Sequence, residues 1–149
     1  MITAREQLYY EAVEQGMELP PLEKHPSYAQ LYLYSAVTRN PHRIHYDQVF
    51  ARSEDHPDVL VHGPLEGAFL AQLLTDWIGG DGFLKQFFYS NRGRAVPGDV
   101  LTCKGKVTEK YERDGQHCVA CEIWMENQRG DAIVRGSAVV ALPSRNQEG

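Results

Sequence analysis

Apolar residues dominate one stretch of the chain, residues 59–78, which reads VLVHGPLEGAFLAQLLTDWI. From residue 64 onward they fall on nearly every side of a helical wheel. The polar residues that interrupt them are Glu66, Gln72, Thr75 and Asp76. A helix without a broad polar face has to be covered by other structure. The pattern therefore predicts a long, buried helix that begins at Pro64 and ends near Gly79.

The start of this helix combines His62, Gly63 and Pro64. A proline in the first turn lacks only an N–H group that would have no partner inside the helix. The glycine before it lets another group come close to the backbone. A buried helix with a bare N-terminus is a site for an oxygen that carries negative charge. The alternative interpretation is a core helix with an ordinary proline start.

The second half of the chain alternates between apolar and polar residues, which is typical of strands. The predicted strands are residues 83–92, 100–111, 117–126 and 132–142. Asp114 and Gly115 form a strong signal for a two-residue hairpin turn. A curved antiparallel sheet wrapped around the long helix is the simplest way to bury both, so we expect an α+β fold. The open edges of such a sheet favour pairing with a second copy.

The first half of the chain predicts shorter elements. Thr3 and Glu6 form a capping-box pair in front of a helix over residues 4–15. Ser27 can cap a helix over residues 28–38, although its tyrosines would also suit a strand. A short helix is expected over residues 47–53. We therefore divide the chain into a helical extension (1–15), a single domain (16–142) and a flexible tail (143–149).

Composition narrows the class of protein. The chain has 149 residues, of which 42% are hydrophobic, enough for one domain with a real core. A net charge of −5 argues against general nucleic-acid binding. The apolar runs are too short for a membrane span, and the charged N-terminus does not resemble a signal peptide, so we expect a cytoplasmic protein.

The three cysteines are Cys103, Cys118 and Cys121. An odd number without a secretion signal indicates a reducing compartment. The last two have C-x-x-C spacing, but in a strand their side chains would point to opposite faces. No second pair completes a zinc site, so we interpret all three as structural thiols.

Polar residues gather in residues 39–47, with the sequence RNPHRIHYD. Histidine is the side chain best suited to general acid or base catalysis near neutral pH, which makes His42 and His45 candidates. The two histidines with Asp47 could instead bind a metal. Further ligands would then come from His56 and His62, although nothing in the spacing requires them. Surface histidines without a role are the remaining alternative.

Three stretches resemble the MaoC-like hydratases and dehydratases of the hot-dog fold, and together they span most of residues 16–142. The first is GMELPPL followed by YAQLYLYSAVTRNPHRIHYDQVFA. The second is VLVHGPLEGAFLAQLL, which is similar to the start of the family's central helix. The third pairs RAVPGDVLTCKGKV with ENQRGDAIVRGSAVVAL. The resemblance implies a curved antiparallel sheet around one long central helix.

The resemblance also implies an activity, the addition of water to, or its removal from, an enoyl thioester of coenzyme A or acyl carrier protein. The family's catalytic histidine falls on His45, and its aspartate falls on Asn40, which is not an acid. NPHRIHYD resembles a subgroup with Asn, His and His at these places. That subgroup includes mesaconyl-CoA hydratases and fungal-type mitochondrial hydroxyacyl-thioester dehydratases. A eukaryotic source would therefore favour the mitochondrial matrix.

Hydration assigns a role to each candidate. His45 is the expected base, and Asn40 can orient the water but cannot take its proton. His42 or Asp47 would hold or replace the missing acid, and the N–H of Gly63 would stabilise the charge on the thioester oxygen. The expected substrate-binding residues are Arg39, Arg43, His62, Pro64, Arg92 and Arg94. The arginines could equally be solvated surface charges. No metal and no cofactor beyond the thioester substrate is expected.

Two other functions fit the sequence. A hot-dog thioesterase would need an acid that activates water, and Glu66 on the central helix is a possible one. A non-catalytic subunit would pair with a second hot-dog protein that completes the site. For an enzyme, a homodimer or a higher homo-oligomer is expected.

Overall fold

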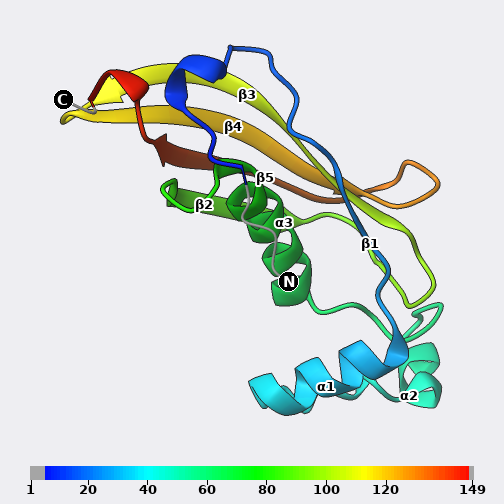
Figure 1. The fold of residues 1–149 in the computed structure, drawn as a ribbon. Helices are drawn as coiled ribbons and strands as arrows, with labels where there is room; N and C mark the ends of the chain where they lie inside the picture. The colour runs from blue at the N-terminus through cyan, green and yellow to red at the C-terminus, as the bar shows by residue number, and fades with distance from the viewer. Residues whose placement is uncertain (1–5, 148–149) are drawn as a thin grey trace.

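The computed structural model describes residues 6–147, which form a strongly curved antiparallel sheet that arches over one long helix, α3 (Gly63–Ile78) (Figure 1). Two shorter helices, α1 (Tyr28–Thr38) and α2 (Gln48–Ser53), lie beyond the sheet near the N-terminal end of α3. This is the predicted α+β arrangement. Within the described residues, no helix is long and apolar enough to cross a membrane.

The sheet has five strands in the order β1-β3-β4-β5-β2, and every pair of neighbours is antiparallel. The strands are β1 (Leu22–Lys24), β2 (Phe83–Asn91), β3 (Leu101–Arg113), β4 (Gln116–Glu126) and β5 (Ala132–Leu142). The predicted strands in the second half of the chain are confirmed to within a few residues. Asp114 and Gly115 connect β3 to β4 with φ angles of 53° and 74°, as the hairpin signal predicted.

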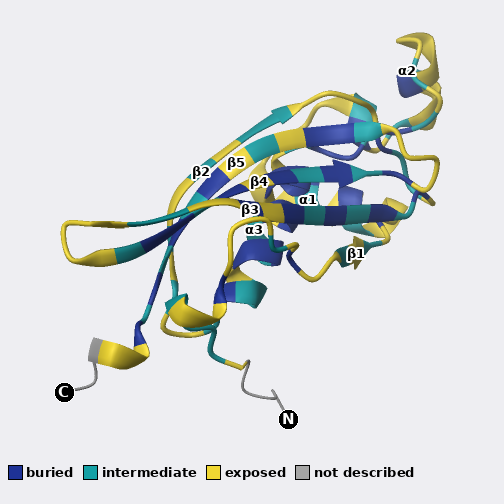
Figure 2. Cartoon of the chain, turned by 90° about the horizontal axis from the view of Figure 1, so that it is seen from above, coloured by how far each residue is buried: buried dark blue, intermediate teal, exposed yellow. Residues whose placement is uncertain are grey.

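Side chains alternate between the two faces of each strand, so every second one points toward α3. In β3, the buried positions are Leu101, Cys103, Gly105 and Val107, as predicted. Figure 2 shows that much of the burial lies along the strands, whereas α2 is mostly exposed apart from its buried Ala51. All three cysteines are buried and free. Burial raises the pKa of Cys103 and Cys121 to about 12, so both thiols keep their protons.

The central helix is covered on most of its circumference, but not on all of it. Its buried residues are Leu65, Glu66, Gly67, Phe69, Leu70, Leu73, Leu74 and Ile78. The sheet curves over only one side of the helix, so a strip that includes Pro64, Ala68 and Thr75 stays exposed. The prediction of a helix wrapped on every side is therefore only partly correct for this single chain.

The helices that precede α3 begin where the sequence predicted. Ser27 caps α1 by accepting a hydrogen bond from the N–H of Gln30 at 3.2 Å. Asp47 caps α2 in the same way through Phe50 at 3.0 Å. Such caps satisfy N–H groups that have no partner inside the helix. The alternative strand over residues 28–38 is wrong.

The predicted helix over residues 4–15 is wrong for the residues that the structure describes, and its capping residue Thr3 lies outside them. Only η1 (Tyr10–Ala12), a single 3₁₀ turn, forms there. The segment follows the sheet instead, because Lys110 on β3 donates hydrogen bonds to the carbonyls of Tyr10 at 2.9 Å and Val13 at 2.5 Å. Val13 is completely buried. Long-range contacts override the local helical pattern.

The predicted flexible tail is held in place as far as residue 147. The carbonyl of Pro143 accepts a hydrogen bond from the N–H of Tyr10 at 3.0 Å. The hydroxyl of Ser144 bonds to the carboxylate of Glu11. A 3₁₀ turn, η3 (Arg145–Gln147), follows. Polar composition suggested fraying, but these contacts tie the segment to η1.

Candidate functional site

His45 lies at the end of a 3₁₀ turn, η2 (Arg43–His45), between α1 and α2. His45 is only 9% exposed. Nδ1 lies 2.8 Å from the carbonyl oxygen of Leu60. A carbonyl can only accept, so Nδ1 carries the proton and Nε2 has the free lone pair when the ring is neutral. Nε2 has no hydrogen-bond partner among residues 6–147.

Burial lowers the pKa of His45, and the nearby charge of His42 lowers it further, although the bond to Leu60 acts in the opposite direction. The rings of His42 and His45 have centroids 6.1 Å apart. A lowered pKa keeps the His45 ring neutral, and therefore able to accept a proton, at pH values where an ordinary histidine is partly charged. Its geometry and its pKa both suit a general base.

His62 is the residue before α3, and it packs directly on His45. The two rings are stacked with centroids 3.8 Å apart and planes 16° from parallel. The His62 ring is completely buried, so the expectation that it binds substrate does not fit this structure. Its Nε2 lies 2.7 Å from the hydroxyl of Ser35 on α1. Burial, followed by the charge of His45, lowers the pKa of His62 to about 4.

The stack places His45 at the N-terminal end of α3, next to Gly63. The N–H of Gly63 has no acceptor within residues 6–147, as expected for the first turn of a helix. The close approach that the glycine permits is made by Asn91 at the end of β2. A Cβ at position 63 would lie 2.8 Å from Oδ1 of Asn91. Any larger side chain would displace this amide from the helix end.

Asn91 also donates a hydrogen bond from Nδ2 to the carboxyl of Glu66 in the first turn of α3. Glu66 is only 2% exposed, and burial raises its pKa to about 8. At neutral pH the carboxyl therefore keeps its proton and has little access to water. These properties do not suit the water-activating acid that a thioesterase would require.

Asn40 and His42 organise the loop that carries His45. The N–H of Asn40 donates to the carbonyl of Ser35 at 2.9 Å, and its Oδ1 accepts from the N–H of His42 at 3.2 Å. His42 in turn accepts from the N–H of Ile44 through Nδ1 at 3.4 Å. The donor Nδ2 of Asn40 has no partner in the described part of the chain, which leaves it free to orient a water molecule.

Asp47 does not fit the role of the missing acid. Its carboxylate caps α2 and accepts two hydrogen bonds from Arg43, at 2.7 and 3.1 Å. The cap and the Arg43 guanidinium both lower the pKa of this carboxyl, which therefore stays ionised. Arg43 also lies over the ring of Phe50, 4.4 Å from its centroid. The pair holds the loop to α2, and the expected contact of Arg43 with substrate stays a prediction.

The other expected substrate-binding residues are spread over the surface. Arg94 donates from Nη1 to the carbonyl of Asp55 at 3.0 Å, so it connects two loops. Arg92 and Pro64 are exposed. Arg39 is exposed as well, and its left-handed backbone (φ 54°) ends α1. These three arginines are all exposed, and their expected part in substrate binding stays a prediction.

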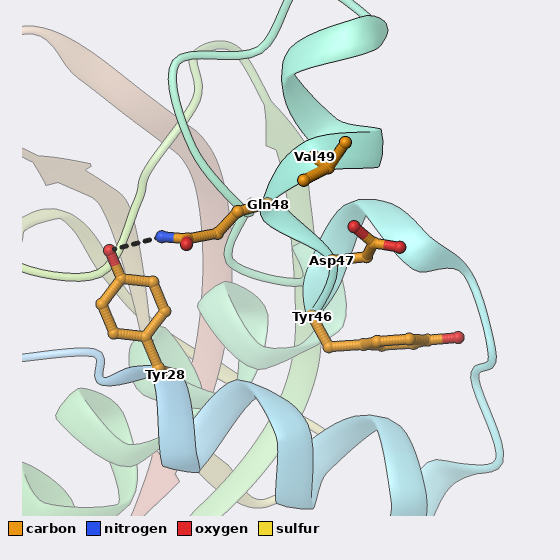
Figure 3. Close-up of a pocket in the computed structure, with 5 residues that line it drawn as sticks. All are labelled: Tyr28, Tyr46, Asp47, Gln48 and Val49. Atoms are coloured by element: carbon orange, nitrogen blue, oxygen red, sulfur yellow. Dashed lines mark hydrogen bonds between the residues drawn. The ribbon is translucent and has the colours of Figure 1, made fainter.

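Two hollows flank the loop that carries His45. Figure 3 shows the first, in which Tyr28 of α1 faces Gln48 of α2 and the two side chains are hydrogen-bonded at 3.3 Å. None of the histidines lines it. The second hollow, of about 480 Å³, is bordered by Arg39, Asn40 and the Ser35 that bonds to His62. No histidine lines this hollow either, and Ser35 is its link to His62. Among the described residues, no three His, Cys, Asp or Glu side chains form a metal-binding group.

Comparison with known families decides the assignment. The model for hydroxyacyl-thioester dehydratase type 2 matches residues 11–97, which include the polar loop, both stacked histidines and the start of α3. The chain belongs to this family. The resemblance to MaoC-like hydratases that the sequence suggested is confirmed.

Two curated relatives match part of this dehydratase-family chain. It is 41% identical over 64 residues to the mesaconyl-C(4)-CoA hydratase of Chloroflexus aurantiacus. This match covers 38% of this chain and 23% of the relative. It is 36% identical over 75 residues to the fatty acid synthase subunit beta of Aspergillus oryzae, which covers 48% of this chain and 4% of the relative. The chain thus matches less than a quarter of the length of either protein.

Solved structures confirm the hot-dog fold of this family member. The R-hydratase PhaJ1 from Pseudomonas aeruginosa superposes with a TM-score of 0.83 at 23% identity, covering 93% of this chain and 88% of that one. The (R)-hydratase from A. caviae superposes with a TM-score of 0.77 at 25% identity, and the match covers 89% of this chain and 99% of that one. The MaoC-like dehydratase from Rhodospirillum rubrum gives 0.80 at 21% identity, covering 93% and 98%.

Ser35, Leu60 and Asn91 belong to the site, and the sequence did not single them out. Ser35 and Asn91 contact residues that lie 27 and 25 positions away in the chain. Leu60 contributes a backbone carbonyl, which any residue would carry. Only the polar residue at the end of a predicted strand, Asn91, offered a signal, because a strand end is a common place for a residue of a site.

Proposed function

We propose that this protein is a hydro-lyase that adds water to 2-enoyl thioesters of coenzyme A, or removes it from the corresponding 3-hydroxyacyl thioesters. The observation that carries the proposal is the position of the His45 ring. It lies against His62, the residue before Gly63, at a helix end whose first N–H has no acceptor among the described residues. A base and an oxyanion donor thus lie at the same end of α3.

The proposed reaction begins at Nε2 of His45, which takes a proton from a water molecule held by the amide of Asn40. The hydroxide oxygen bonds to the β-carbon, and the electrons of the double bond move to give an enolate at the thioester. The N–H of Gly63 stabilises the enolate oxygen, a contribution of about 3–4 kcal/mol for a donor of this kind. The imidazolium of His45 then delivers the proton to the α-carbon, so one water is consumed.

This scheme needs no second acid. It accounts for Asn at position 40, since an amide can orient water without exchanging protons. It also leaves Asp47 ionised in its bond with Arg43. The reaction as written requires acid–base chemistry and an oxyanion donor, and neither step calls on a metal or an organic cofactor.

We also propose that the working form contains two hot-dog units, either two copies of this chain or this chain with a second subunit. The edge strand β2 presents the exposed side chains of Phe83 and Phe88, and the strip along α3 is uncovered in the single chain. A sheet edge with apolar neighbours favours pairing. Sedimentation of the purified protein, alone and co-expressed with candidate partners, separates the two arrangements.

The deciding experiment follows hydration of a short 2-enoyl-CoA, such as crotonyl-CoA, by the loss of its enoyl-thioester absorbance. His45→Ala should abolish most of the activity with the fold intact by circular dichroism. His25→Ala, at an exposed histidine on the β1 side, is the matched control and should retain it. Undiminished turnover by His45→Ala would refute the proposal. Release of free thiol instead of hydration would assign a thioesterase.

A further inference from the structure

The buried pair formed by Ser35 and His62 has no role in the reaction described above. His62 is completely buried, so it cannot touch a substrate directly, and Ser35 is only 6% exposed where it borders the second hollow. Their side chains lie 2.7 Å apart and connect α1 to the residue before α3. Polar groups are costly to bury, and a hydrogen-bonded pair in this setting fixes the groups around it.

His62 is held on three sides. The hydroxyl of Ser35 fixes Nε2, and the ring of Tyr34 meets it edge-on with centroids 4.7 Å apart and planes at 60°. The third contact is the flat stack on His45. With these contacts the ring cannot turn without losing a hydrogen bond or an aromatic contact. His62 therefore presents a fixed plane to His45.

Within the described part of the chain, the ring of His45 makes one hydrogen bond, from Nδ1 to the carbonyl of Leu60. One bond fixes one atom of the ring, but it allows the ring to swing about that point. The stack on His62 removes this freedom, because it keeps the plane of the His45 ring within 16° of the plane of the His62 ring. The direction in which Nε2 of His45 points is thus set by both contacts.

The charge state of His62 suits this arrangement. Its Nδ1 is buried with no hydrogen-bond partner in residues 6–147, and its pKa is lowered to about 4, so the ring is neutral in neutral solution. A neutral face next to His45 does not oppose the positive charge that forms there when Nε2 accepts a proton. The titratable rings that face His45 are those of His42 and His62.

We propose that Ser35 and His62 are positioning residues that hold the His45 ring in the one orientation that presents Nε2 to the reacting water. The inference rests on the proposed role of His45 as the base. Ser35 anchors His62, and His62 orients His45, so their effect on the reaction passes entirely through that ring.

The test combines kinetics with ¹⁵N NMR of the histidine rings. His62→Ala should lower kcat by about 10- to 100-fold with KM changed less than about twofold, because misorientation of a catalytic group affects the chemical step. His62→Phe keeps a flat ring beside His45 and should recover most of that loss. Ser35→Ala should lower kcat less than His62→Ala does.

The NMR readout does not depend on activity. In the native protein, the neutral His45 ring should show one tautomer, with Nδ1 protonated; in His62→Ala, its nitrogen signals should move toward the average of two tautomers. Leu74→Ala, a buried truncation elsewhere on α3, is the control for general destabilisation and should leave these signals unchanged.

A folded His62→Ala protein with native His45 signals and native kcat would overturn the inference. Loss of activity in His62→Ala with native His45 signals would also overturn it, since the effect would then bypass the ring. If His45→Ala is fully active, the proposed function fails, and the NMR comparison still decides whether His62 orients His45.

Discussion

The side-chain amide of Asn91, on the edge strand β2, is hydrogen-bonded to the buried carboxyl of Glu66 in the first turn of α3. The bond crosses from the sheet to the helix at the point where the candidate site lies. The bond holds the Glu66 carboxyl, which keeps its proton at neutral pH, in the first turn of α3. It also fixes the Asn91 amide that packs against Gly63.

Glu66 should make stability fall as the pH rises. Its pKa is about 8 in the folded protein and near 4.5 in the unfolded chain. Between these values only the unfolded chain releases the proton, so each pH unit costs the fold about 1.4 kcal/mol. The total loss of stability is on the order of 4–5 kcal/mol. It is absent below the pKa of the unfolded chain and constant above the pKa of the folded protein.

Urea denaturation from pH 5 to pH 8.5 measures this slope. Glu66→Gln removes the titrating group and should flatten it, so the variant should be more stable than the native protein at pH 8. Glu14→Gln, at an exposed glutamate, is the matched control. The same slope in Glu66→Gln as in the native protein would show that another group is responsible.

The pH profile of hydration should reflect the lowered pKa of His45. The base is active when it is neutral, so the acidic limb of kcat/KM should lie below 6.5, the ordinary histidine value. His42→Ala removes a charge that lowers the pKa of His45, and the limb should then move to higher pH. A limb that stays in place would mean that His42 does not act on His45.

Asp47 should prove structural. Asp47→Asn keeps an oxygen that can cap α2, so hydration should continue at a rate close to that of the native protein. Asp47→Ala loses both the cap and the partner of Arg43, and its melting temperature should fall. Thermal melts and initial rates of both variants provide the measurement. Complete loss of turnover in Asp47→Asn alone would restore Asp47 as the missing acid.

Lys110 should hold the N-terminal segment to the sheet. Its ammonium group donates to the carbonyls of Tyr10 and Val13 and lies 4.2 Å from the centroid of the Tyr10 ring. Lys110→Met should lower the free energy of unfolding by about 1–3 kcal/mol, since it leaves the carbonyl of the buried Val13 without its donor. It should also speed proteolysis near residue 13.

Lys106→Met is the control for this prediction, because Lys106 lies on the same strand with an exposed side chain. Equal stability of the two variants in urea would contradict the assignment of Lys110.

The sequence predicted secondary structure well where it depends on contacts between residues close together in the chain. The Ser27 cap, the Asp114 and Gly115 turn and the alternation in β3 all act over a few residues, and each is found where the sequence indicated. Residues 6–15 contained an equally good local pattern, yet Lys110 and Pro143 determine their path. A local pattern carries no information about such distant partners.

The same distinction applies to the site. The sequence drew attention to His45 and Gly63, and the structure brings them to the same helix end. The sequence could not show whether His62 is a buried neighbour of His45 or a substrate ligand, because the burial of His62 depends on the packing of α1. The ion pair of Arg43 with Asp47 was likewise hidden, although the two are only four positions apart.

The bond between the N–H of Tyr10 and the carbonyl of Pro143 places the two outermost described segments side by side. A short loop could join them without disturbing the sheet, and the exposed turn at Asp114 and Gly115 offers a place to open the chain. A circular permutant that starts within this turn should therefore assemble the same architecture, with the order of its strands in sequence rearranged and the end of α3 undisturbed.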